Sequence, residues 1–179
     1  MIEGKKIILR AYKESDIEIS FKLINTLNIR TMLGRNNIFP FSMSAQKEFV
    51  EKAMINNGPT FNFAIEEKES GEYIGGCGIN SYDDKNRKVI IGLWLGEQYQ
   101  GKGYGSDVLR TLCRFIFDEM NIHKIDLDYF SFNEKGKKCY EKVGFKQEGV
   151  RRKELFRFGK YHDIIEMGLF KEELILKED

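Results

Sequence analysis

The chain has 179 residues, 41% of them hydrophobic and 32% charged, and its 29 basic and 28 acidic side chains leave a formal net charge of +1. This length suits one complete core, so we expect a single domain spanning residues 1–179. The balanced charge gives no reason to expect a nucleic acid partner. The polar first residues and the lack of a long apolar run argue against a signal peptide and a membrane span, which predicts a cytoplasmic protein.

The cysteines indicate neither a disulfide framework nor a metal site. Cys77, Cys113 and Cys139 are odd in number, have no C-x-x-C spacing and are accompanied by two histidines only. Cys77 falls in an expected strand and Cys113 on the apolar face of an expected helix. We therefore predict buried free thiols and no bound metal.

The first part of the chain predicts a strand, two helices and a loop. Residues 6–11 form a short strand, and the spacing of Ser15 and Glu18 predicts a capping box that starts a helix. Ser44 is expected to cap a second helix, and residues 31–43 have the composition of a loop. The side chains expected to point inward are Ile17, Phe21, Leu23 and Ile24 in the first helix and Phe49, Val50 and Met54 in the second.

The rest of the chain predicts a strand meander followed by a crossover. Strands are expected over 61–66, 73–81 and 88–95, and a further strand over 124–130. Antiparallel strands followed by a strand–helix–strand crossover indicate an α+β (mixed α/β) fold with a mixed sheet. The helix of the crossover is expected to bury Val108, Leu109, Leu112, Phe115 and Ile116.

The most informative segment joins the third strand of the meander to that helix. The apolar strand ends at Gly96, and Gly101, Gly103 and Gly105 follow before a helix expected to begin near Ser106. Three glycines in five residues leave backbone N–H groups uncovered at a helix N-terminus, where unpaired donors and the helix dipole favour a phosphate group. The segment therefore predicts a phosphate-binding loop, with a ligand-free glycine turn as the alternative.

Two nucleotide-binding motifs fit this loop poorly. A P-loop requires G-x-x-x-x-G-K-[ST], which Gly96, Gly101 and Lys102 match, but residue 103 is glycine and the hydroxyl that holds magnesium is missing. A dinucleotide loop requires G-x-G-x-x-G, and its last glycine would fall on Ser106. Such a loop also comes early in a βαβ unit, whereas more than half of this chain precedes it.

A third pattern fits better. Gln100, Gly103 and Gly105 give [Q/R]-x-x-G-x-[G/A], and Asn133 and Tyr140 give N-x6-Y, with one expected helix and one expected strand between the two motifs. In order and distance they resemble the acetyl-CoA region of the GCN5-related N-acetyltransferases (GNAT). Residues 148–167 resemble the closing hairpin of the branch that contains ribosomal-protein N-terminal and spermidine N-acetyltransferases.

This resemblance implies a fold and a set of donor contacts. It implies a central mixed, mostly antiparallel sheet flanked by helices, in which the strands on either side of the glycine loop and its helix run parallel and then splay apart. The pantetheine arm of acetyl-CoA would pair with the first of them at Leu93, Trp94 and Leu95, where Gly92 and Gly96 suit a β-bulge or an ordinary turn. The other implied contacts are Gln100, Gly101, Lys102, Gly103, Tyr104, Gly105, Ser106 and Asn133.

The resemblance also implies a catalytic acid. Acetyl transfer from a thioester needs a donor for the developing oxyanion and a proton for the departing thiolate. The family pattern assigns the proton to Tyr140 and the oxyanion donor to the amide of Leu95. A tyrosine with a pKa of about 10 suits a thiol with a pKa of about 8.5. A packing role for Tyr140 is the alternative.

A general base is less well defined by the residues. Asp128 precedes Asn133 by five residues, where some protein N-terminal acetyltransferases of the family carry a glutamate base. In a strand Asp126 and Asp128 share one face, so Asp128 is a candidate base. A solvated acidic face, with a water chain that deprotonates the amine, remains open.

The acceptor is expected between residues 27–54 and residues 151–163. A polyamine would require several carboxylates, so we favour the α-amine of a peptide, a protein N-terminus or a small metabolite. A spermidine-type acceptor and a non-catalytic acetyl-CoA-binding domain are the alternatives, and a homodimer remains open. The first of these regions offers Arg30, Arg35, Asn36, Asn37 and Phe39, with Glu66 and Glu67 as possible sources of negative charge.

Overall fold

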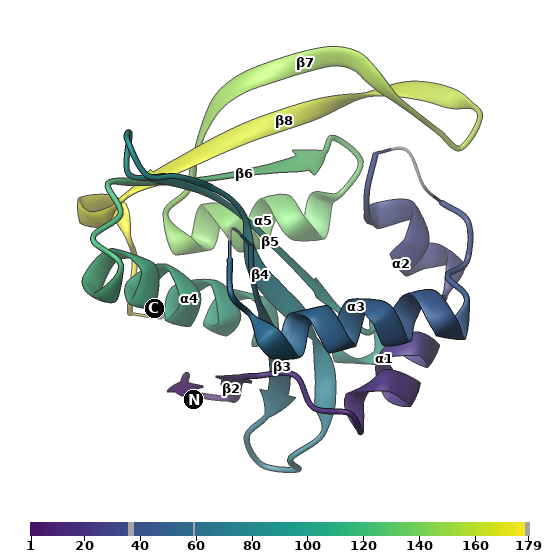
Figure 1. The fold of residues 1–179 in the computed structure, drawn as a ribbon. Helices are drawn as coiled ribbons and strands as arrows, with labels where there is room; N and C mark the ends of the chain where they lie inside the picture. The colour runs from purple at the N-terminus through teal and green to yellow at the C-terminus, as the bar shows by residue number, and fades with distance from the viewer. Residues whose placement is uncertain (36–37, 59, 178–179) are drawn as a thin grey trace.

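The computed structural model describes residues 1–35, 38–58 and 60–177, and within them one sheet of eight strands runs through the molecule (Figure 1). The strand order is β1-β2-β3-β4-β5-β6-β8-β7, and neighbours are antiparallel except for the parallel pair β5 and β6. The expected mixed, mostly antiparallel sheet is confirmed. The strands are β1 (Ile2–Glu3), β2 (Ile7–Arg10), β3 (Phe61–Glu67), β4 (Tyr73–Asp83), β5 (Lys88–Leu95), β6 (Lys124–Phe130), β7 (Lys146–Arg157) and β8 (Lys160–Phe170).

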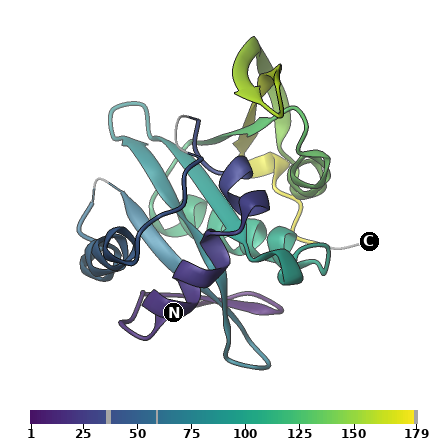
Figure 2. The same ribbon diagram turned by 90° about the vertical axis from the view of Figure 1, so that its right-hand side faces the viewer.

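Helices cover both faces of this sheet. Helices α4 and α5 lie on one face and α1 and α3 on the other, while α2 lies near the β7–β8 hairpin (Figures 1 and 2). Across the described residues, no helix is both long and apolar enough to cross a membrane. The helices are α1 (Asp16–Ile24), α2 (Leu27–Met32), α3 (Met43–Ile55), α4 (Tyr104–Glu119) and α5 (Glu134–Val143).

The two faces have separate cores because side chains alternate along each strand. Under α4 the predicted residues Val108, Leu109, Leu112 and Ile116 are fully buried, and Phe115 packs against them half-buried. On the other face Val50 of α3 is fully buried, but Phe49 and Met54 are each 39% exposed. The expectation that all three point inward was therefore wrong for two of them.

The helix starts differ from the predicted caps. Ser15 has helical backbone angles and makes no capping hydrogen bond, so the predicted capping box with Glu18 is absent from α1. The carboxylate of Asp16 instead accepts from the backbone N–H of Lys13 at 2.9 Å. A capping serine needs extended backbone so that its hydroxyl reaches the first turn, and Ser15 does not meet that condition.

Helix α3 is capped two residues earlier than predicted. Ser42 has extended backbone, and its hydroxyl accepts from the N–H of Ala45 at 3.1 Å. Ser44 already lies within the helix. The predicted loop between the first helices is shorter than expected, because α2 continues to Met32. Asn36 and Asn37 lie outside the described residues.

The parallel pair β5 and β6 is short. Residues Lys88–Ile90 pair with Lys124–Asp126, and no pairing follows. Strand β6 continues to Phe130 against β8, whereas β5 continues to Leu95 against β4. The two strands therefore splay apart toward their C-terminal ends, as the resemblance implied.

One buried carboxylate fixes the start of α4 against the N-terminal strand. Asp107 is 7% exposed, and its two oxygens accept from the backbone N–H groups of Lys5, Lys6 and Ile7 at 3.0, 2.7 and 3.2 Å. A carboxylate in the first helical turn also interacts favourably with the helix dipole. Asp107 thereby connects the glycine loop and α4 to β2.

We predict that Asp107→Ala lowers the free energy of unfolding by about 2–4 kcal/mol, because it leaves three backbone donors without their acceptor. Urea unfolding monitored by circular dichroism measures the loss. The control is Asp118→Ala on the same helix, which removes an exposed ion pair with Lys171 and should cost no more than about 0.5 kcal/mol. Equal losses for the two variants would contradict the role given to Asp107.

Candidate functional site

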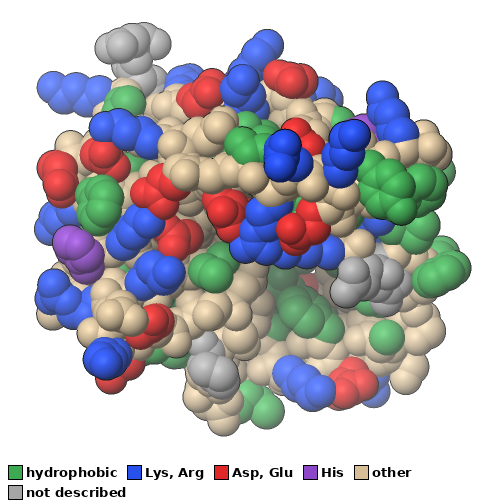
Figure 3. Space-filling model, turned by 90° about the horizontal axis from the view of Figure 1, so that it is seen from above, with side chains coloured by type: hydrophobic (Ala, Val, Ile, Leu, Met, Phe, Trp, Pro, Cys, Tyr) green, Lys and Arg blue, Asp and Glu red, His purple; other side chains and the backbone are tan. Residues whose placement is uncertain are grey.

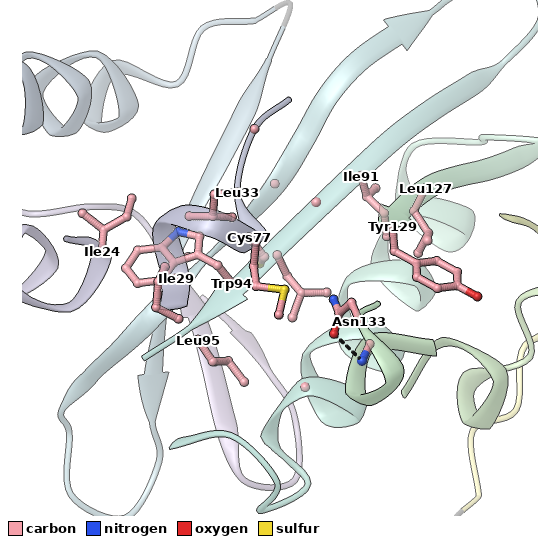
Figure 4. Close-up of a pocket in the computed structure, with 18 of the residues that line it drawn as sticks. Ile24, Ile29, Leu33, Cys77, Ile91, Trp94, Leu95, Leu127, Tyr129 and Asn133 are labelled. Atoms are coloured by element: carbon pink, nitrogen blue, oxygen red, sulfur yellow. Dashed lines mark hydrogen bonds between the residues drawn. The ribbon is translucent and has the colours of Figure 1, made fainter. Parts of the chain in front are cut away.

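A cavity of about 1520 Å³ fills the gap between β5 and β6 and continues toward α2. Its loop end is lined by the glycine loop and α5, and its α2 end by Ile24, Ile29, Leu33, Phe41 and Trp94. Figure 4 shows Trp94 beside Ile24 and Ile29, with Ile91, Leu127 and Tyr129 together on the other side. The two ends belong to one continuous space.

The edge of β5 supplies free backbone donors to this cavity. The N–H of Gly96 donates to Ile74 of β4 at 2.9 Å, and Trp94 lies opposite Gly76. Since hydrogen-bonding direction alternates along an antiparallel strand, the N–H groups of Leu93 and Leu95 face away from β4, into the gap. Trp94 therefore reaches the cavity through its indole ring and not through its amide.

The β-bulge next to β5 lies on the neighbouring strand β4. The register of β4 against β5 shifts between Ile79 and Ser81, which leaves Asn80 as the extra residue of β4. Gly92 and Gly96 carry no register shift, so a bulge at those glycines was the wrong expectation. The shift lies opposite Ile90, the last residue of β5 that pairs with β6. The bulge on β4 and the end of the β5–β6 pairing therefore lie at the same level of the sheet.

The glycine loop has the conformation that its glycines allow. Gly101 and Gly103 have φ of 76° and 86°, in the left-handed region that favours glycine, and α4 begins at Tyr104, two residues earlier than expected. The Ser106 hydroxyl donates to the carbonyl of Gly103 at 3.0 Å, and Gln100 Nε2 donates to the carbonyl of Leu95 at 3.1 Å. These bonds tie the loop to both the helix and the end of β5.

Two of the predicted loop residues, Lys102 and Tyr104, are not among the described residues that line the cavity. The Tyr104 hydroxyl donates to the carboxylate of Glu67. The carbonyl of Lys102 accepts from Lys6 Nζ at 3.1 Å, and that ammonium was not expected near the loop. Leu93, Trp94, Leu95, Gln100, Gly101, Gly103, Gly105, Ser106 and Asn133 do line the cavity.

Asn133 has a structural function in addition to its place in the wall. It is the N-cap of α5, and its Oδ1 accepts from the N–H of Gly136 at 2.9 Å (Figure 4). Lys135 and Lys138 follow it on the same wall of the cavity. The cap fixes the start of the helix that carries Tyr140.

Tyr140 lies on α5 in the wall of the gap. Its ring centroid is 5.6 Å from that of Tyr129 and 6.3 Å from that of Phe145. Burial raises the pKa of its hydroxyl, and the nearby Cys139 and the charge of Asp128 raise it further. The hydroxyl is therefore protonated in the neutral range, as an ordinary tyrosine is, and burial makes it a weaker acid than a tyrosine in water.

Asp128 lies on β6 beyond the last residue that pairs with β5. Leu127 and Tyr129 are buried under α4 and α5, so Asp128 projects from the opposite side of the strand, as the alternation predicted. Its carboxylate forms an ion pair with Arg35, which follows α2. Asp126 is paired differently, with Lys124 at 3.1 Å and Lys88 at 3.4 Å.

Charged side chains of both signs surround the α2 end of the cavity, whereas the side chains inside that end are apolar. Arg30 lies 3.9 Å from the ring centroid of Phe41, and Glu48 pairs with Lys52 at 2.6 Å. Figure 3 shows acidic and basic side chains interspersed on the face seen from above in Figure 1, beside a hollow with hydrophobic atoms in it.

Glu66 and Glu67 do not reach this cavity. Glu66 is 2.5 Å from the guanidinium of Arg10, and Glu67 accepts from Tyr104 and Ser70. The suggestion that they supply negative charge to the acceptor was wrong, because both are occupied at the other end of β3.

The sequence did not reveal several polar residues of the wall. The cavity is also lined by Tyr12 from the segment before α1, Gln46 from α3 and Cys77 from β4. Cys77 is a free thiol, and burial raises its pKa, so it stays protonated. The signal available for Gln46 was its place on the face of α3 that also buries Val50 and Ala53, whereas Tyr12 lies between β2 and α1 and offered none. In the described ranges no cluster of three or more metal-binding side chains occurs.

Sequence comparison identifies relatives along the whole chain. Residues 6–146 match the family model described as an acetyltransferase (GNAT) domain. The chain is 31% identical over 175 residues to the SPbeta prophage-derived uncharacterized N-acetyltransferase YokL of Bacillus subtilis, which covers 97% of this chain and 94% of that protein.

Solved structures share the fold. The spermidine N-acetyltransferase from Vibrio cholerae, in complex with CoA and spermine, matches with a TM-score of 0.84 at 24% identity, over 95% of this chain and 98% of that one. A GNAT-family acetyltransferase from Bacillus anthracis matches with a TM-score of 0.83 at 20% identity, over 96% and 99% of the two chains.

We predict that Gly103→Val abolishes acetyl-CoA binding, because a β-branched residue strains the left-handed backbone and covers the loop amides. Isothermal titration calorimetry on the folded variant measures the loss. The matched control is Gly71→Val in the β3–β4 turn, where φ is 73° and nothing lies within 4 Å of a new Cβ. It carries the same backbone strain away from the cavity and should bind acetyl-CoA normally. Unchanged affinity in Gly103→Val would refute the loop assignment.

Proposed function

Because the chain belongs to the acetyltransferase (GNAT) family, we propose that it transfers the acetyl group of acetyl-CoA to the primary amine of an acceptor that binds in the same cavity. The observation that carries this proposal is the continuity of the cavity. One space joins the glycine loop to the α2 end, and Tyr140 and Asp128 both line it. Two substrates can therefore enter from opposite ends and meet.

The loop end suits a phosphorylated thioester donor. The N–H groups at the start of α4 and in the loop would bind the pyrophosphate, since Gly101 and Gly103 leave them uncovered. The N–H groups of Leu93 and Leu95 would pair with the amides of the pantetheine arm, as an extended ligand pairs with a sheet edge. Lys135 and Lys138 would add positive charge on the α5 side.

The chemistry requires few groups from the protein. The neutral amine attacks the thioester carbonyl, and the developing oxyanion accepts a hydrogen bond from the N–H of Leu95. As the C–S bond breaks, the Tyr140 hydroxyl gives its proton to the thiolate, and the proton lost by the amine replaces it through solvent. Asp128 would receive the acceptor's ammonium group and accept its proton before the attack.

The charge around the α2 end favours an acceptor with one ammonium group. Of the described acids that line the whole cavity, Glu48 and Asp128 are paired with Lys52 and Arg35, and Glu134 lies at the start of α5. A polyamine would need more free carboxylates than this wall offers. An α-amine, with a pKa of about 8, also has a useful neutral fraction near pH 7.

A panel of acceptors tests the proposed reaction. The purified chain is incubated with acetyl-CoA and either the peptide Ser-Ala-Ala-Ala-amide, the same peptide with its α-amine blocked, or spermidine, and both thiol release and product mass are measured. We expect turnover with the free peptide, no turnover with the blocked peptide, and a lower kcat/KM with spermidine. A preference for spermidine would identify the polyamine alternative, and no turnover with any amine would indicate a non-catalytic acetyl-CoA-binding domain.

We predict that Tyr140→Phe lowers kcat by on the order of 10²–10⁴ with little change in the Kd for acetyl-CoA. The variant keeps the ring that packs against Tyr129 and removes only the proton donor. The loss should affect kcat and kcat/KM alike, since the bond is made mainly in the transition state.

Tyr129→Phe is the matched control for this variant. Tyr129 lies beside Tyr140 and is buried, but it has no assigned role in proton transfer. Its substitution should change kcat by no more than a few fold. Near wild-type turnover in Tyr140→Phe would show that Tyr140 is a packing residue, and a large loss in acetyl-CoA affinity with kcat preserved would make it a donor contact.

A further inference from the structure

The Asp128 carboxylate, which would receive the acceptor's ammonium group, already forms an ion pair with Arg35. Arg35 and Asp128 lie 93 residues apart in sequence, and both line the cavity. Their ion pair crosses from the segment after α2 to the free end of β6. The acceptor's ammonium group carries the same charge as the guanidinium and would need the same carboxylate.

The pair is weak enough to exchange. The side chains of Arg35 and Asp128 are 37% and 35% exposed, and solvent screens such pairs strongly. Arg35 also has a second carboxylate within reach, since its Nη1 is 3.3 Å from Glu154 Oε1 on β7. Release from Asp128 therefore leaves the guanidinium with a partner.

The linked ion pairs around Arg35, here called the ion-pair ladder, contain one more carboxylate than guanidinium group. Arg35 contacts Asp128 and Glu154, and Arg151 contacts Glu154 and Glu166. Three carboxylates thus share two guanidinium groups, and one negative charge is left unbalanced within this ladder. An incoming ammonium group at Asp128 would balance it, with Arg35 moving fully onto Glu154.

We propose that Arg35 is an internal competitor of the acceptor: it occupies Asp128 in the free enzyme and moves to Glu154 when an ammonium group binds. Arg35 is then a specificity-determining residue, because only a cation that binds Asp128 better than Arg35 does can enter. This inference rests on the proposed function, since it requires an amine acceptor at the α2 end. Tyr140 lines the same cavity as Asp128, so the bound amine and the proposed proton donor would share one space.

Competition between Arg35 and the acceptor for Asp128 predicts opposite shifts in the acceptor KM for substitutions at Arg35 and Glu154. With Ser-Ala-Ala-Ala-amide and spermidine as probes at saturating acetyl-CoA, Arg35→Gln should lower the acceptor KM about two- to five-fold, because exposed ion pairs are weak and the competitor is gone. Glu154→Gln should raise the KM by a similar factor, because Arg35 loses its alternative partner. In an Asp128→Asn background, neither substitution should change the KM further.

The control removes an exposed ion pair outside the cavity. Lys68→Gln breaks the pair with Glu3, which is 2.7 Å long, and should leave the KM unchanged. A KM that rises or stays constant in Arg35→Gln would overturn the proposal, as would a shift that persists without Asp128. If Arg35→Gln does not fold, the Glu154→Gln shift and its dependence on Asp128 decide the question. Absence of acetyl transfer by the wild-type chain would instead contradict the proposed function.

Discussion

The site depends on the point at which β5 and β6 stop pairing. A parallel pair that continued to Leu95 would satisfy the backbone groups of Leu93 and Leu95 and leave no gap. Pairing ends at Ile90, at the level where β4 carries an extra residue, Asn80, while β6 stays in register with β8 along its whole length. A backbone donor left unpaired in a buried place costs about 1–3 kcal/mol, so these edges require water or a ligand in the gap.

The same divergence separates the two ends of the cavity chemically. The loop end offers backbone donors, the N-terminus of α4 and the ammonium groups of α5, all of which favour an anionic, extended ligand. The α2 end offers an apolar interior around Trp94 and paired charges at its rim. Tyr140, which packs against Tyr129, and Asp128, whose side chain is partly exposed to solvent, lie on the walls of the cavity. One space therefore presents a phenolic hydroxyl and a carboxylate between its two ends.

The elements around the glycine loop could be predicted from the sequence because their signals are local. The strand up to Leu95, the glycine run and the apolar stripe of α4 lie in one continuous segment, and Gly103 has the left-handed backbone that its identity suggested. The α2 end could not be predicted in the same way. The partner of Asp128 is 93 residues away, and the bulge at Asn80 comes from a register between two strands. The cap of α3 was misplaced because two serines, Ser42 and Ser44, compete for it and only backbone conformation decides between them.

Amide hydrogen exchange at the edge of β5 tests most directly whether this gap is the donor site. Exchange rates of individual amides are measured by NMR with and without saturating acetyl-CoA. We expect the N–H groups of Leu93 and Leu95 to exchange fast in the free protein and to become strongly protected on binding. The N–H of Trp94, which faces β4, should be protected in both states. Binding of acetyl-CoA without added protection at Leu93 and Leu95 would show that the donor lies elsewhere and would contradict the account.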